Sequence, residues 1–118
     1  MKWYLAKLVY RIICGDGNHT SQFDEQLRLI YAEDDFHAFT KARLIGEKEE
    51  DHFQSFYNKP VKWKFIDVSE MHLLDNLIDG AELYSRINEQ DDAETYIRST
   101  QTRAKDLFEK SIHPLLLN

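Results

Sequence analysis

The sequence predicts an α+β fold: a two-layer sandwich in which two helices cover one face of a four-stranded antiparallel sheet. Apolar residues alternate with polar ones in four segments, as in strands, and recur at helical spacing in two others. The order strand-strand-helix occurs twice, which favours helices layered on a sheet. A chain of 118 residues has the size of one domain. We therefore expect a single domain over residues 1–118, with halves at about 2–57 and 60–112 and an apolar tail at 113–118.

The first half begins with two predicted strands. In residues 2–14 the odd positions mix apolar and basic side chains, whereas five even positions are uncharged: Tyr4, Ala6, Leu8, Tyr10 and Ile12. Period-two geometry places the even set in the core and the odd set on a second, wetter face. Residues 23–32 form the next strand, joined to the first as an antiparallel hairpin by a turn cluster at 15–18. The two sides of this strand are Phe23, Leu27, Leu29 and Tyr31, and opposite them Asp24, Gln26 and Arg28.

The first helix follows directly. Glu33-Asp34-Asp35 opens it, because aspartate accepts hydrogen bonds from free N–H groups and its charge complements the helix dipole. Gly46 predicts a kink or a break in the middle. The charged run at 47–51 is typical of a solvated helix face, and apolar residues continue at helical spacing through Phe53 and Phe56.

The second half repeats the pattern. Residues 61–69 and 81–88 read as strands, and Met71–Ile78 fits either an extension of the first of them or a short helical turn. The last helix is capped by Asp91, with Glu94 three residues on, and His113-Pro114 ends it.

Charge and cysteine content narrow the function classes. The formal net charge of −6 disfavours general adhesion to nucleic acid or to an anionic membrane. The single cysteine, Cys14, cannot form an intrachain disulfide. No run of 18 apolar residues and no secretory signal is evident, so we expect a cytoplasmic protein. Metal-ligand spacing, phosphate loops and nucleophile elbows are absent from the sequence, and we expect no cofactor and no metal site.

Three segments carry a family resemblance. They are Trp3-Tyr4-Leu5-Ala6-Lys7-Leu8, the alanine-containing helix through Ala38 and Ala42, and Asp79-Gly80-Ala81-Glu82-Leu83-Tyr84-Ser85. Together they resemble a family of short, uncharacterised bacterial proteins, a domain of unknown function. The resemblance spans most of residues 2–88 and implies a compact bacterial protein with no assigned activity.

The wetter sheet face is the predicted functional surface. Its ligand or interface candidates are Trp3, Lys7, Arg11, Arg28, Glu82, Tyr84 and Arg86. This face combines aromatic and aliphatic groups with most of the strand cations, a mixture common in protein interfaces. The same mixture suits single-stranded nucleic acid, whose bases stack on aromatic rings. A third reading is that the tail Leu115-Leu116-Leu117 covers this face.

We therefore expect a non-catalytic protein-interaction module that self-associates as a homodimer, with an unidentified protein as another partner. One alternative is a module that binds a small anion or single-stranded RNA on the basic and aromatic face. Another is an acidic inhibitor or immunity-type protein that uses residues 47–51 and 89–94. An enzyme built from Glu82, Tyr84 and Arg86 beside Lys7 is the remaining hypothesis, although no catalytic motif supports it.

Overall fold

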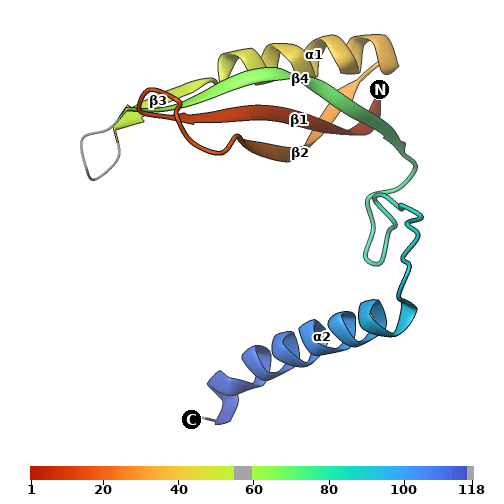
Figure 1. The fold of residues 1–118 in the computed structure, drawn as a ribbon. Helices are drawn as coiled ribbons and strands as arrows, with labels where there is room; N and C mark the ends of the chain where they lie inside the picture. Colours follow the sequence, from red (N-terminus) through yellow and green to blue (C-terminus); the bar gives the residue numbers. More distant parts are fainter. Residues whose placement is uncertain (55–59, 117–118) are drawn as a thin grey trace. The chain divides into compact units, whose positions relative to one another are not determined.

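The computed structural model describes residues 1–54 and 60–116, with side chains described for 1–50 and 60–111. The chain divides into two compact units, Met1–Tyr84 and Ser85–Asn118. The first unit contains a sheet and one helix, and the second contains one helix (Figure 1). The single domain over 1–118 stays a prediction. Phe56, to which the helix was expected to continue, and the side chains of the tail at 115–118 lie outside the described residues.

An antiparallel sheet with the order β2-β1-β4-β3 forms the first unit. Its long strands are β1 (Lys2–Cys14), β2 (Gln22–Ala32) and β4 (Pro60–Leu74). Strand β1 is central and pairs with both of the others, with Lys7 opposite Leu27 on one side and opposite Glu70 on the other. The short strand β3 (Asp51–Gln54) pairs with the first residues of β4. The hairpin predicted between residues 2–14 and 23–32 is therefore present.

Helix α1 (Asp35–Lys48) lies along one face of this sheet (Figure 1). Asp34 is its N-cap, as the acidic start predicted, and its Oδ1 accepts a hydrogen bond from the His37 backbone N–H at 2.8 Å. The helix runs through Gly46 without a break. The charged run after Gly46 does not continue the helix as expected, because α1 ends at Lys48 and β3 begins at Asp51.

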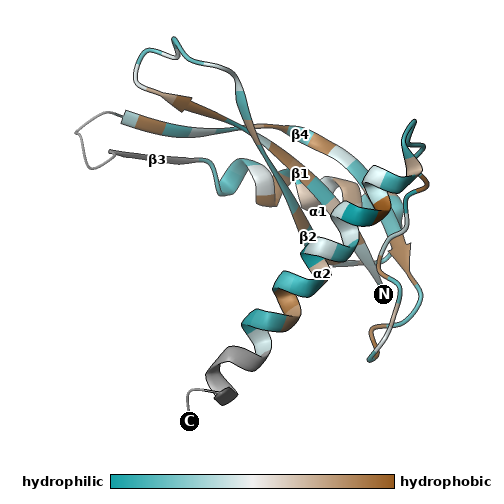
Figure 2. Ribbon diagram, turned by 60° about the horizontal axis from the view of Figure 1, so that its bottom comes forward, coloured by the Kyte–Doolittle hydropathy of each residue, from teal (hydrophilic) through white to brown (hydrophobic). Residues whose placement is uncertain are grey.

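The core lies between α1 and the even-numbered side of β1. Tyr4, Ala6, Leu8 and Tyr10 are buried there, together with Ile30 and Ala32 of β2 and Ala38 and Ala42 of α1. Alanine at the helix positions brings the helix backbone close to the sheet, and the larger strand side chains fill the remaining space. Figure 2 shows both apolar and polar stretches along the strands of this sheet.

The predicted ββαββα architecture, with four long strands under two helices, is wrong. Residues 81–88, expected as the fourth strand, form no strand, and the body of the sheet is three long strands. The strand expected at 61–69 extends to Leu74, which resolves the first part of the ambiguous segment. Only α1 is layered on the sheet within the first unit. The class α+β with two helices is confirmed.

Helix α2 (Ala93–Leu116) forms most of the second unit. Its cap is Asp92 rather than Asp91, because Asp92 Oδ1 accepts from the Thr95 backbone N–H at 3.2 Å. The backbone of the helix continues past His113-Pro114 to Leu116. Its apolar side chains are exposed within this unit, including Ile97, Leu107 and Phe108. In the part of the chain that the structure describes, no helix combines the length and hydropathy of a membrane span.

Candidate functional site

The sheet face opposite α1 is the candidate functional site, and we call it the open face. It is built by the odd-numbered residues of β1 and β2, because the even-numbered ones of β1 pack against α1. The strand register sets its rows, with Trp3 opposite Tyr31, Leu5 opposite Leu29 and Arg11 opposite Phe23. Strand β4 adds Glu70 opposite Lys7 and His72 opposite Leu5.

One side of the open face is apolar and exposed. Strand β2 contributes Phe23, Leu27, Leu29 and Tyr31, which we call the apolar row. Their exposed fractions are 55%, 58%, 51% and 40%. Trp3 extends the row onto β1, with its ring centroid 4.6 Å from that of Tyr31. Single exposed hydrophobic residues are ordinary, but several on one side of one strand, interrupted here only by Glu25, are typical of an interaction surface.

The apolar row lies on the side where the sequence had placed charge. We expected Arg28 beside Trp3 and Lys7, but Arg28 pairs with Ala6 in the register and therefore lies on the helix side. The more apolar side of β2 thus faces away from the helix-covered core. In the single chain this arrangement leaves apolar side chains of β2 exposed to water, which is unfavourable.

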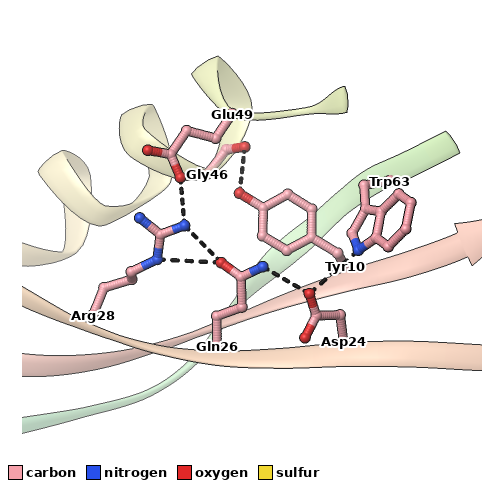
Figure 3. A network of polar contacts seen from close by, with 7 residues as sticks. All are labelled: Tyr10, Asp24, Gln26, Arg28, Gly46, Glu49 and Trp63. Carbon is pink, nitrogen blue, oxygen red and sulfur yellow. Dashed lines mark hydrogen bonds and ion pairs between the residues drawn. The ribbon is translucent and has the colours of Figure 1, made fainter. Parts of the chain in front are cut away.

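A polar network explains why Arg28 can occupy the helix side (Figure 3). Its guanidinium donates to Gln26 Oε1 at 2.7 Å and forms an ion pair with Glu49, which caps the end of α1. Gln26 in turn donates to Asp24 Oδ2 at 2.7 Å, and Trp63 Nε1 donates to the same oxygen at 3.2 Å. The even-numbered residues of β2 therefore tie β4 and the end of α1 to the edge of the sheet.

Lys7 stands at the centre of the open face between two carboxylates. Its ammonium lies 2.9 Å from Glu70 Oε2 and 3.4 Å from Glu25 Oε1. The hydrogen bond to Glu70 raises the pKa of Lys7, against a smaller opposing effect of desolvation. The same contact lowers the pKa of Glu70, and the Tyr84 hydroxyl, which donates to Glu70 Oε1 at 3.1 Å, lowers it further. Lys7 is thus charged and already neutralised by its neighbours.

Tyr84 holds the end of the first unit on the β4 side of the open face. Besides its bond to Glu70, its ring lies 4.6 Å from the His72 ring, centroid to centroid. Leu5, which stands opposite His72 in the register, is only 6% exposed. The β4 side of the open face is therefore covered in part, whereas the β2 side is not.

The predicted site residues divide into three groups. Trp3, Lys7 and Arg11 lie on the open face as expected, and Tyr84 reaches it through Glu70. Arg28 lies on the opposite side. Glu82 and Arg86 are exposed, belong to no strand and fall in different units, so the expected ladder of alternating strand residues does not form.

Sequence reasoning missed two parts of this site. Glu70 joins Lys7 to Tyr84, but its segment, just before the ambiguous residues 71–78, had no assigned face. The apolar row was recognised as one side of a strand and assigned to the wrong layer. The signal that could have found it is the number of apolar residues on the odd side of both β1 and β2, which exceeds what one small core needs.

Comparison with known proteins gives a family and no further relative. No curated protein and no solved structure matches the chain. A family model described as Domain of unknown function (DUF4288) matches residues 3–85. This range coincides closely with the first unit, Met1–Tyr84, and confirms the predicted membership of an uncharacterised family. Because the match covers well over half of the chain, the protein belongs to the family described as Domain of unknown function (DUF4288).

Proposed function

We propose that this protein is a non-catalytic interaction module that self-associates as a homodimer by burying the apolar row of β2 against a second copy. The observation that carries the proposal is the exposure of Phe23, Leu27, Leu29 and Tyr31 on a regular strand. Removing such a row from water contributes roughly 25 cal/mol for each Å² of apolar surface buried.

At the centre of the open face, the charges around Lys7 support a protein partner over an anionic ligand. Lys7 is engaged by Glu25 and Glu70, and Arg28 is engaged on the opposite side by Glu49. An anion at Lys7 or Arg28 would have to displace these carboxylates, and their remaining charge would oppose it. Lys7 and Tyr84, two of the residues considered for catalysis, both contact Glu70. These contacts give them a structural role, because they hold residue 84 against the sheet.

The experiment that tests the proposal measures oligomeric state. We expect the 118-residue chain at micromolar concentration to have twice its own mass of 14.0 kDa in light scattering after size exclusion. Leu29→Glu should give the monomer, because it places a carboxylate in the apolar row. Leu29 is 51% exposed within the chain, so its replacement should leave the fold intact.

Leu44→Glu is the matched control. Leu44 is 61% exposed on α1 and lies outside the open face, so this variant should stay dimeric. The proposal fails if the unaltered protein shows only 14.0 kDa at these concentrations. It also fails if Leu29→Glu and Leu44→Glu have the same mass.

A further inference from the structure

We propose that the two copies meet along the outer edge of β2, in an antiparallel, two-fold arrangement centred on Gln26. This inference rests on the proposed function and deepens it, because it names the strand and the register through which a second copy binds. The result would be one continuous sheet through both copies.

Strand β2 is the regular edge of the sheet. It stands at one end of the order β2-β1-β4-β3, and it pairs with β1 from Gln22 to Ala32 without a shift in register. It contains neither proline nor glycine. On the other side, β4 carries two irregularities, at Ile66 and Ser69, and Glu50 Oε1 accepts from the Phe65 backbone N–H at 2.9 Å. Bulges and side-chain contacts protect an edge from pairing, whereas a long regular edge is a template for another strand.

The hydrogen bonding of the edge selects the register. Lys41 Nζ donates to the Tyr31 carbonyl at 2.9 Å. We infer that the Tyr31 carbonyl points away from β1, since it accepts from Lys41. Backbone N–H and C=O groups of successive residues point to alternate sides of an antiparallel strand, so the outward groups of β2 belong to its odd-numbered residues. A centre at Gln26 pairs residues 22–30 with residues 30–22 of the second copy and leaves Tyr31 to Lys41. A centre at Leu27 would require the Tyr31 carbonyl opposite Phe23.

Charge on the helix side favours the same centre. Along this side, Asp24, Gln26 and Arg28 read as negative, neutral and positive. Two-fold pairing about Gln26 sets Asp24 opposite Arg28 of the second copy, twice. Opposite charges directly across two strands stabilise their pairing. On the open face, the same register sets Phe23 opposite Leu29 of the second copy at both ends of the pairing, with Glu25 opposite Leu27 between them. A second copy is therefore the occupant that this edge fits in charge and in apolar pattern.

Disulfide cross-linking of the 118-residue chain tests the register. Cys14 is first replaced by serine, because it is the only cysteine. Gln26→Cys then places two thiols at the centre, in a pair without backbone hydrogen bonds whose Cα atoms lie about 4.5 Å apart, within disulfide range. Leu27→Cys places them diagonally, at about 7–8 Å, outside that range. Thr40→Cys, on an exposed position of α1, reports random collision.

We expect the Gln26→Cys protein to form a covalent dimer at least about tenfold faster than the other two, because only its thiols meet the distance requirement. Faster cross-linking of Leu27→Cys would overturn the register. Absence of cross-linking in a protein that light scattering shows to be dimeric would overturn edge pairing and leave the proposed function standing. A monomeric unaltered protein would contradict both edge pairing and the proposed function.

Amide hydrogen exchange on the unaltered protein avoids any change to the Gln26 network. The outward N–H groups of Glu25, Leu27 and Leu29 should exchange more slowly as protein concentration rises through the dimer dissociation constant. The Tyr31 N–H, beyond the paired stretch, should change less. Exchange rates at Glu25 and Leu27 that do not depend on concentration, in a protein that dimerises, would contradict the inference.

Discussion

At the scale of single residues, Gly46 shows how closely α1 approaches the sheet. A Cβ added at Gly46 would lie 2.3 Å from Phe65 Cε1, and the Gly46 carbonyl accepts a hydrogen bond from the Tyr10 hydroxyl at 2.9 Å. Glycine in a helix interior normally costs roughly 0.5–1 kcal/mol of stability relative to alanine. Replacing it by alanine therefore stabilises a helix wherever there is space for the added methyl group. We predict the reverse, a loss of about 1–3 kcal/mol in the free energy of unfolding, measured by urea denaturation.

A double-mutant cycle provides the control. In a Phe65→Leu background the clashing ring is gone, so Gly46→Ala should cost clearly less than in the unaltered protein. Equal losses in both backgrounds would show that contact with Phe65 is not the cause. The sequence suggested a kink at Gly46 because glycine disfavours helix, and it could not show that Phe65 lies against this position from a strand far along the chain.

Tyr10 of β1 is the partner of Gly46 in the contact between α1 and the sheet. Its ring is 1% exposed, and its hydroxyl satisfies a carbonyl in the last turn of α1, where helix carbonyls have no partner of their own. Tyr10→Phe should lower the free energy of unfolding by about 1–2 kcal/mol, because it leaves this buried carbonyl without a donor. Tyr96→Phe, at a tyrosine 47% exposed on α2, should change it little, and equal effects on urea denaturation would refute the role of the bond.

At the scale of elements, the contact of Lys7 with Glu70 links β1 to β4 and makes stability depend on pH. The folded pKa of Glu70 lies below its ordinary value of 4.5, first because of Lys7 and then because of Tyr84. The unfolded chain therefore binds more protons in this window, and the stabilisation is present above pH 4.5 and lost as pH falls through the folded pKa. The Lys7 pKa is raised from 10.5, so Lys7 stays charged throughout.

We predict that Glu70→Gln flattens the acid side of the stability profile. The variant should melt at a lower temperature than the unaltered protein at pH 7, and the two melting curves should converge as pH falls toward 3. Glu82→Gln, at an exposed glutamate of the same unit, is the control and should reproduce the unaltered profile. Parallel profiles for Glu70→Gln and the unaltered protein would contradict the assignment.

The elements also show where sequence patterns stop being informative. Alternation located β1 and β2 and their hairpin, and aspartates located the start of α1, because these signals are local. The prediction of which side of β2 packs against the helix was wrong, because either side can do so. One side carries Leu27 and Leu29, and the other carries Arg28, which forms an ion pair with Glu49. Which side meets the helix depends on partners distant in sequence, and one chain does not reveal them.

At the scale of the whole molecule, the strand predicted at 81–88 failed for a related reason. Alternating apolar and polar residues indicate which side chains of a strand would face the core. A strand also needs an unpaired edge of a neighbouring strand with which to form hydrogen bonds. The start of β4 is paired with β3 instead, and Tyr84 is held by side-chain contacts with Glu70 and His72. The family match ends at residue 85, next to the boundary of the first unit at Tyr84, so two independent observations separate residues 1–84 from the rest.

That boundary gives the last prediction. Residues 1–84 contain the core, the apolar row and the outer edge of β2, so this fragment should unfold cooperatively and remain dimeric in light scattering. Residues 85–118 alone should show little helix by circular dichroism, because the apolar side chains of α2 are exposed within their own unit and an isolated helix is marginal in water. A monomeric but folded fragment 1–84 would mean that α2 supplies the association instead, through its own exposed residues such as Ile97 and Phe108.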